Sequence, residues 1–207
     1  MSDCDCSIEV ESRQQGRVLT TLLAINAAMF VVEVVTGILA ESTGLIADSL
    51  DMLADAVVYG IALYAVGRAA RAKSRAAFVS GYFQIALALI VALDVSRRAI
   101  FGSEPEPGYM IVVGLVALAA NVVCLILISR HRDGGVHMRA SWIFSKNDVI
   151  ANVGVVLSGG LVWVTGIRWP DLAVGIAIAY IVFRGALAII AEAKHEQSKA
   201  TTTQSAD

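Results

Sequence analysis

Residues 109–129 read YMIVVGLVALAANVVCLILIS, and this stretch contains no charged side chain. A helix of about 20 apolar residues is long enough to cross a hydrocarbon core about 30 Å thick. The stretch therefore predicts a transmembrane helix. The whole chain shares its character, because hydrophobic residues make up 57% of the 207 residues and charged residues only 16%, which is more apolar than a typical soluble domain.

Five further apolar stretches flank this one on both sides. The six predicted spans cover residues 19–40, 44–66, 76–101, 109–129, 138–165 and 172–191. Only three residues, 41–43, join the first two spans, and a short turn around Trp169 and Pro170 joins the last two. Each of these pairs must then be antiparallel neighbours. The predicted fold class is an all-α membrane protein, a six-transmembrane-helix bundle.

The basic residues of the loops predict the orientation of the bundle. A cytoplasmic N-terminus places eleven Lys and Arg residues inside: Arg13, Arg17, Arg68, Arg71, Lys73, Arg75, Arg130, Arg132, Arg139, Lys194 and Lys199. It leaves only Arg97, Arg98 and Arg168 outside. Since cytoplasmic loops are enriched in Lys and Arg, both termini are predicted to be cytoplasmic.

The polar ends of the chain complete the predicted organisation. We expect a cytoplasmic N-terminal tail over 1–17, a transmembrane domain over 18–192 and a disordered cytoplasmic tail over 193–207. No basic segment followed by an apolar one precedes the first span, so we expect no cleavable signal peptide. The expected location is a multi-pass position in the lipid bilayer of a bacterial inner membrane. A net charge of −2 gives no indication of a nucleic-acid partner.

Acidic residues inside the second and fifth spans are the strongest functional signal, since ionisable groups at membrane depth are costly. Asp48, Asp51 and Asp55 follow one another at offsets of three and four, which places them on one helix face. Asp148 and Asn152 are four residues apart in the fifth span and also share a face.

The depth of these carboxylates predicts that they meet. From a rise of about 1.5 Å per residue, Asp51 and Asp55 lie roughly 10 to 17 Å below the outer end of their span, and Asp148 about 15 Å from the inner end of its own. Carboxylates brought together in one layer repel each other unless protons or a cation neutralise them. A bound divalent metal ion is therefore the predicted occupant.

Other interpretations of the intramembrane polar residues remain open at this point. Asp48 is either part of the site or a cap near the helix end, and protonated carboxyls could instead bond between helices. Glu33 and Asp94 are single acidic residues in the first and third spans and carry a weaker prediction of a transport role. Lys146 lies off the Asp148 face, and it either extends toward the inner surface or pairs with Glu33.

Two stretches resemble motifs of the cation diffusion facilitators, a family of divalent metal exporters. Residues 47–55, ADSLDMLAD, resemble the second-helix motif of that family, in which an acidic residue or His is followed after three residues by Asp. Asp51 and Asp55 occupy these two positions. Residues 138–154, MRASWIFSKNDVIANVG, resemble the fifth helix, where the family has His, three residues and then Asp. Asp148 matches that Asp, and the resemblance covers roughly residues 13–192.

The chain departs from the family pattern at two places. Phe144 stands where the family has its first fifth-helix ligand, and a phenyl ring cannot bind a metal. The predicted ligands are therefore Asp51, Asp55 and Asp148, with Asn152 as fourth donor and Asn147, Ser145 or water as alternatives. An all-oxygen set admits manganese, iron or cobalt beside zinc. The second departure is that the usual cytoplasmic C-terminal domain is missing, as in short family members.

The resemblance implies a divalent metal cation transporter that works by alternating access with proton antiport, as a homodimer. Zinc is the preferred metal, with manganese, iron, cobalt or cadmium as alternatives, and no resident cofactor is expected. The competing class is a non-transporting membrane subunit or metal sensor that retained the fold. An enzyme is not expected, since the chain has no HExxH motif, no nucleophile beside a base and no phosphate-binding loop.

Two cysteines in the N-terminal tail allow one further hypothesis. Cys4 and Cys6 are separated by one residue, and two thiolates at that spacing suit Zn²⁺ or Cu(I). They either capture metal at the cytoplasmic entrance or are incidental residues of an unstructured tail.

Overall fold

The chain forms six α-helices and no strand in the part that the structure describes. The helices are α1 (Ser2–Leu39), α2 (Thr43–Ala65), α3 (Ala70–Phe101), α4 (Pro107–Ser129), α5 (Val136–Thr165) and α6 (Trp169–Gln204). This structure is a computed structural model. It describes the backbone of residues 2–65, 70–130 and 136–204, and the side chains of residues 13–61, 63, 64, 78–130, 142, 145–191 and 194.

The all-helical fold predicted from hydropathy is confirmed, and each predicted span lies on one helix. Five helices contain a segment long and apolar enough to cross a membrane: residues 13–39, 78–101, 107–129, 145–165 and 169–191. The remaining helix, α2, carries three acidic residues, Asp48, Asp51 and Asp55, within one apolar run, whereas none of the other five segments carries more than one. The chain is a multi-pass membrane protein.

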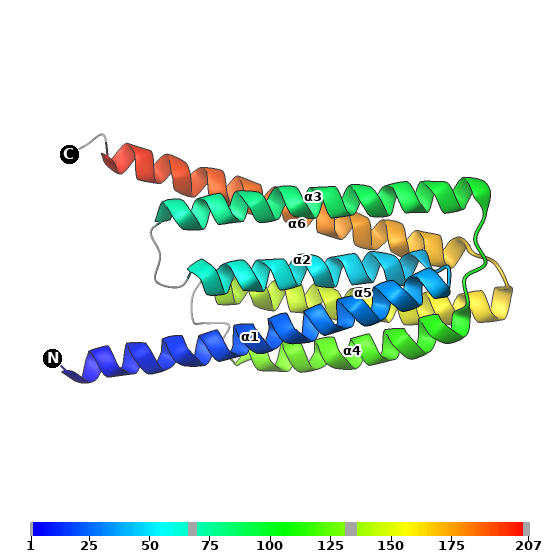
Figure 1. Ribbon diagram of the computed structural model, residues 1–207, viewed down its shortest axis with the longest axis horizontal. Coiled ribbons are helices and arrows are strands. Elements are labelled where there is room, and N and C mark those ends of the chain that lie inside the picture. The colour runs from blue at the N-terminus through cyan, green and yellow to red at the C-terminus, as the bar shows by residue number, and fades with distance from the viewer. Residues whose placement is uncertain (1, 66–69, 131–135, 205–207) are drawn as a thin grey trace.

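Helix α2 is the central element of the bundle. It contacts all five other helices, whereas α1 packs chiefly on α2 and α4, and α3 chiefly on α6 and α2. Figure 1 shows the six helices lying roughly along one axis, with α3 and α6 on one side of α2 and with α1 and α4 on the other. A helix surrounded in this way can carry acidic residues without presenting them to lipid.

Both ends of the chain lie at one end of the bundle. Helix α1 begins and α6 ends at the left of Figure 1, and the connections 40–42, 102–106 and 166–168 lie at the opposite end. We call the first the terminal end and the second the short-loop end. That the terminal end faces the cytoplasm stays a prediction from the charge bias.

The two ends of the chain are more helical than their polar sequences indicated. Residues 193–204, which we predicted as part of a disordered tail, continue α6, and α1 begins at Ser2. Residues 192–200 read EAKHEQSKA, and Ala, Glu, Gln and Lys are good helix formers that propagate a helix already nucleated by the span. The division into tails and a transmembrane domain stays a prediction.

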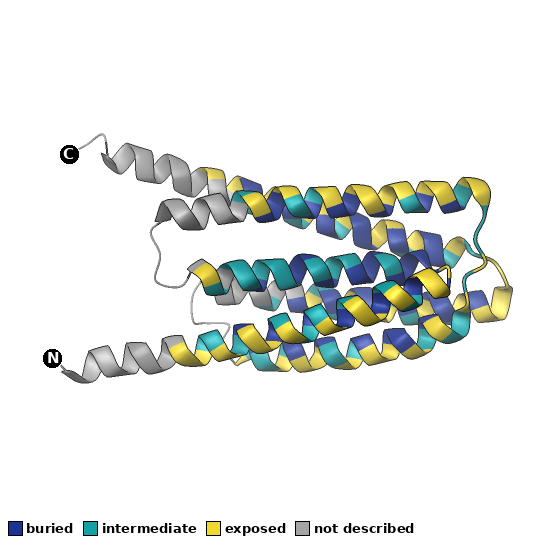
Figure 2. Cartoon of the chain, in the orientation of Figure 1, coloured by how far each residue is buried: buried dark blue, intermediate teal, exposed yellow. Residues whose placement is uncertain are grey.

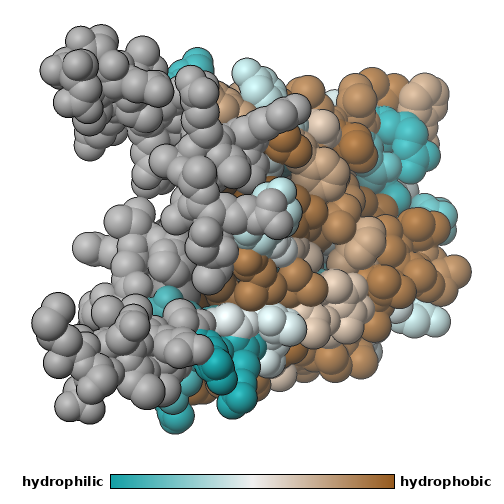
Figure 3. Space-filling model, turned by 60° about the vertical axis from the view of Figure 1, so that its left-hand side comes forward, coloured by the Kyte–Doolittle hydropathy of each residue, from teal (hydrophilic) through white to brown (hydrophobic). Residues whose placement is uncertain are grey.

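Apolar side chains cover the outside of the bundle. Exposed hydrophobic residues occur along α1, α3, α4, α5 and α6, for example Leu93, Val116, Leu157 and Ile176, whereas α2 contributes only Tyr64 among its described side chains. Figure 2 shows the same contrast, with exposed residues running along the outer helices and α2 mainly buried or intermediate. The face in Figure 3 carries a broad hydrophobic surface across its middle, as expected for a surface in contact with lipid.

Asp171 joins α6 to the start of α2 at the short-loop end. Its Oδ1 accepts hydrogen bonds from the Ser42 hydroxyl at 2.6 Å and from the Gly44 N–H at 2.9 Å, and its Oδ2 accepts one from the Thr43 N–H at 2.7 Å. The first N–H groups of a helix have no partner within the helix, so this carboxylate caps α2 from a different helix. A Cβ atom at Gly175 would lie 2.7 Å from Thr43 Cγ2, which explains why glycine stands at this crossing.

Candidate metal centre

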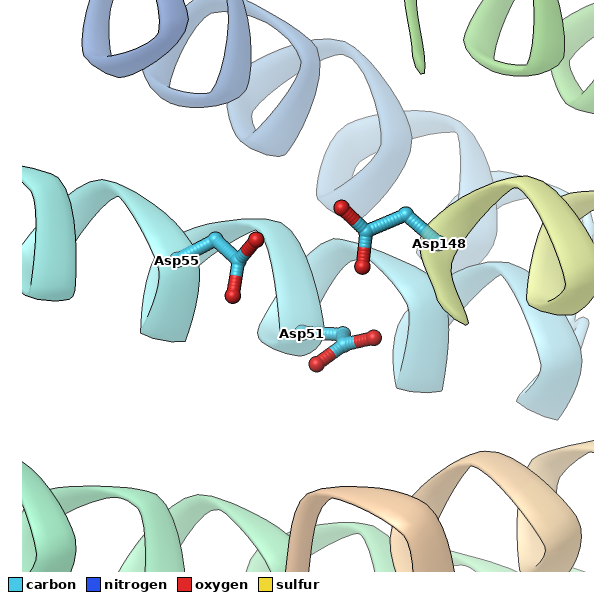
Figure 4. A group of neighbouring side chains, drawn as sticks. All are labelled: Asp51, Asp55 and Asp148. Atoms are coloured by element: carbon cyan, nitrogen blue, oxygen red, sulfur yellow. The ribbon is translucent and has the colours of Figure 1, made fainter. Parts of the chain in front are cut away.

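Three aspartates from two helices converge in the interior of the bundle. Asp51 and Asp55 lie on α2 and Asp148 lies on α5, and each offers a carboxylate oxygen within 4.8 Å of the other two. Figure 4 shows the three side chains extending from α2 and α5 into the same space. The three carboxylates therefore lie close together, as the spacing of these residues predicted.

The convergence follows from helix geometry. The spacing of four residues between Asp51 and Asp55 stacks the two carboxylates on one face of α2, about 6 Å apart along the axis. Helix α5 runs antiparallel to α2 and packs against it, so it presents Asp148 to that face at the same level. Neither helix alone holds more than part of the group.

Burial differs among the three carboxylates. Asp55 and Asp148 are 3% and 5% exposed, whereas Asp51 is only partly buried. None of the three forms an ion pair with a residue that the structure describes; in that part of the chain Asp94 pairs with Arg97 and Arg98. Three like charges at this separation repel strongly in a medium of low dielectric constant. The group therefore requires protons or a cation, and Asp51 is its most exposed member.

A tyrosine that the sequence analysis did not select holds Asp55 in place. The Tyr59 hydroxyl donates a hydrogen bond to Asp55 Oδ2 at 3.0 Å and lies 3.2 Å from Ser145 Oγ on α5. Tyr59 and Ser145 are both fully buried. Ser145 thus bonds Tyr59 and forms a second link between α2 and α5. The offset of four from Asp55 to Tyr59 was the available signal, because it places the two on one face.

Asn152, the predicted fourth donor, does not direct its amide nitrogen at the three carboxylates. Its Nδ2 donates to the backbone oxygen of Asp148 at 2.9 Å and to Asp48 Oδ1 at 3.3 Å. Its side-chain oxygen is buried and has no hydrogen-bond partner among the described residues. Asn152 as a fourth ligand stays a prediction, as does the complete ligand set. Asp48 is 1% exposed and bonds across to α5, so it is not an interfacial cap.

The remaining candidates of the sequence analysis fall in different places. Asp94 accepts hydrogen bonds from Arg97 at 3.0 Å and from Arg98 at 2.6 Å on its own helix, which accounts for its charge without a transport role. Lys146 is exposed, and its Nζ lies 5.9 Å from the centre of the Trp142 ring, so it does not pair with Glu33. The side chains of Phe144, Cys4 and Cys6 lie outside the described residues.

The donor set of the three aspartates determines what the group can bind. Carboxylate oxygens suit hard and borderline divalent cations, whose charge would offset the repulsion among the aspartates. A proton competes with the metal for the same oxygen atoms. The arrangement can therefore exchange a metal ion for protons.

The chain is similar to known metal-efflux proteins over most of its length. Residues 19–196 match the family model described as the cation efflux transmembrane domain. The chain is 29% identical to the zinc transporter ZitB of Pectobacterium atrosepticum over 94% of this chain and 64% of that protein. It is 27% identical to the metal cation efflux system protein CzcD of Cupriavidus metallidurans over 78% of this chain and 55% of that protein.

A third relative adds an antiporter to this group. The cadmium, cobalt and zinc/H(+)-K(+) antiporter of Bacillus velezensis is 21% identical over 58% of this chain and 39% of its own length. The chain thus spans less than two thirds of the length of these relatives. The family model covers the helices that carry the three aspartates, and this match together with the six-helix fold makes the chain a member of the cation efflux (cation diffusion facilitator) family, a transporter family rather than a family of enzymes.

Proposed function

We propose that this protein exports a divalent metal cation from the cytoplasm in exchange for protons, and that Asp51, Asp55 and Asp148 bind the ion during transport. The observation that supports this function is the convergence of three carboxylate oxygens from α2 and α5 within 4.8 Å. Membership in a family of efflux transporters favours the same function. The ion is the cargo of the protein and not a resident cofactor.

The proposed coupling follows from competition at shared atoms. Each carboxylate must be ionised to bind the metal, so binding releases protons and protonation releases the metal. Because two helices share the ligands, a small rotation of α5 against α2 would separate Asp148 from Asp51 and Asp55 and weaken binding. Alternating access then requires that the ligands face the terminal end in one state and the short-loop end in the other.

Zinc is the first metal to test, and manganese, iron, cobalt and cadmium follow. Two of the relatives are named for their metals: one is a zinc transporter, and the other is an antiporter of cadmium, cobalt and zinc. The oxygen-only set favours harder ions than a set that contains imidazole. A ligand from Asn152 or a water molecule would complete the coordination sphere. A homodimer, cytoplasmic termini and a bacterial inner membrane belong to the same proposal.

The decisive experiment measures metal flux and proton flux together in proteoliposomes. Vesicles are prepared with the wild-type protein, with Asp51→Asn or with Asp148→Asn. One set of each encloses a metal-sensitive dye and the other a pH-sensitive dye, and both sets are tested against the five metals. We expect both variants to lose metal-driven proton flux, because each loses one negative ligand without a change of size. Asp94→Asn is the matched control, since Asp94 pairs with Arg97 and Arg98 outside the site, and it should keep wild-type flux.

Two outcomes would contradict the proposal in different ways. Full flux in both aspartate variants would remove these residues from the site. Metal binding by the wild type with no flux of any of the five metals would instead favour a non-transporting subunit or metal sensor.

The pH dependence of binding tests the proton coupling directly. Metal affinity should rise as pH rises, because ionised carboxylates bind the metal and protonated ones do not. In weakly buffered detergent solution, binding of the metal to wild-type protein should release protons, and Asp148→Asn should release fewer. Affinity that is independent of pH with no proton release would overturn the antiport mechanism while leaving metal binding intact.

A further inference from the structure

A second group of buried oxygen atoms lies beside the three aspartates, on α1, α2 and α5. Glu33 on α1 is 0% exposed, Asp48 on α2 is 1% exposed and Asn152 on α5 is 0% exposed. The carboxyl groups of Glu33 and Asp48 are close enough to interact electrostatically. Asn152 Nδ2 is 3.3 Å from Asp48 Oδ1. The three side chains thus form one connected group, and of these only Asn152 is also a candidate ligand of the proposed transport site.

The hydrogen bonding of this group is incomplete in one specific respect. Both oxygens of Glu33, Oδ2 of Asp48 and the side-chain oxygen of Asn152 are buried and have no hydrogen-bond partner among the described residues. All four atoms can accept a hydrogen bond, and none of the described residues donates one to them. An isolated buried charge costs several kcal/mol unless it is paired, so something must supply positive charge or donors here.

A cation satisfies this group better than a proton does. One proton shared between Glu33 and Asp48 would serve one oxygen of each residue and leave the Asn152 oxygen without a partner. A divalent cation accepts oxygen ligands from carboxylates and from an amide carbonyl alike. The amide of Asn152 is already fixed by its nitrogen, which donates to Asp48 and to the Asp148 backbone.

We propose that Glu33, Asp48 and Asn152 form a second binding position for the transported divalent cation. This inference rests on the proposed export function and adds a step to it. Asp48 precedes Asp51 by three residues, about 4.5 Å along the axis, on the side of the short-loop end. An ion that leaves Asp51, Asp55 and Asp148 toward that end therefore reaches the second position next, and Asn152 connects the two through its hydrogen bond to Asp148.

If the second position exists, the protein should still bind a metal ion after the ligands Asp51, Asp55 and Asp148 are removed. The probe is Mn²⁺, which suits oxygen ligands, counted by equilibrium dialysis against the full-length protein in detergent. The triple variant Asp51→Asn, Asp55→Asn, Asp148→Asn should still bind one Mn²⁺, and the further change Glu33→Gln should remove it. Glu41→Gln is the matched control, because Glu41 is an exposed residue of the connection between α1 and α2, and it should leave the ion bound. Circular dichroism checks that each variant is folded.

The result that would overturn this inference is distinct from failure of the proposed function. A folded triple variant that binds no Mn²⁺ would dismiss the second position, and the transport site would be unaffected. A second measurement covers the case in which the triple variant does not fold. In otherwise wild-type protein, Glu33→Gln should lower the rate of Mn²⁺ transport about tenfold or more, as expected for lost metal ligation, and should weaken Mn²⁺ binding. A changed pH profile with unchanged Mn²⁺ binding would show that Glu33 carries only a proton.

Discussion

Helices α2 and α4 are both 23 residues long and have opposite roles. Helix α4 has no charged residue, and exposed valines and leucines lie along much of its length. Helix α2 carries three aspartates, contacts every other helix and has little exposed apolar surface. Helix α4 is stabilised by lipid on one side and packing on the other, whereas α2 depends on its protein neighbours. The helix that carries three aspartates within its apolar run supplies two of the three carboxylates of the site.

The comparison has an energetic side. A carboxylate at the bilayer centre costs about 2.5 to 3.5 kcal/mol on insertion scales, so three on one helix would prevent its insertion if they faced lipid. In α2 the three aspartates face α1 and α5 instead of lipid. Their charges must then be neutralised by protons or by a bound cation. Stability and function are therefore opposed in α2, whereas α4 carries no charged residue and has no such conflict.

The largest expected effect comes from removing one charge of α2. Asp55→Asn should reduce metal transport by more than about a hundredfold, because loss of an outer-sphere partner alone costs 10- to 100-fold in metal affinity. The same variant should melt in detergent at an equal or higher temperature than the wild type, since a buried like-charge repulsion is relieved. Transport assays and thermal unfolding without added metal measure the two effects. A variant that loses both activity and folding would show that Asp55 is structural.

A charge placed on α4 should have the opposite outcome. Val116 is 52% exposed on the outer face of α4, and Val116→Asp should cost roughly 3 kcal/mol for insertion. We expect the yield of folded protein in the membrane to fall to a small fraction of the wild type. Val116→Leu is the control and should express normally. Normal yield of the aspartate variant would mean that this face of α4 packs against protein, as in a dimer.

Hydropathy alone predicted most of the fold, because lipid imposes a simple rule on length and composition. The span predicted over 109–129 lies within α4, which begins at Pro107, and the other spans also match single helices. The offsets of three and four within α2 predicted a shared face, and that prediction needs only the helical period. The pairing of Asp94 with Arg97 and Arg98 was also accessible from offsets of three and four.

Contacts between side chains on different helices could not be predicted from the sequence. Glu33 carried only a weak prediction, because nothing in α1 indicates that its side chain meets Asp48 on α2. The cap that Asp171 supplies to α2 depends on how α6 crosses the start of that helix. Such contacts depend on the rotation and crossing of two helices, and hydrophobic periodicity constrains these poorly when helices are apolar on all sides.

The next largest effect concerns the support of α2 by α6. Asp171→Ala should destabilise the protein by roughly 2 kcal/mol, because it removes a cap and leaves buried N–H groups of residues 43 and 44 without an acceptor. Thermal unfolding in detergent measures this loss. Asp171→Asn keeps one acceptor oxygen and should fall between the wild type and the alanine variant. Equal stability of all three proteins would mean that the α2 cap contributes nothing to folding.

The smallest expected effect tests how precisely α2 must hold its ligands. Tyr59→Phe removes the hydroxyl that bonds Asp55 and approaches Ser145, and leaves the ring that packs with Leu19, Leu22 and Cys124. We expect metal affinity to fall about tenfold, the usual size of an effect on ligand orientation, with little change in stability. Tyr82→Phe on the exposed face of α3 is the matched control. If Tyr59→Phe binds metal like the wild type, Asp55 is oriented by the ion itself, and α2 then supplies charge at the right depth rather than a preformed geometry.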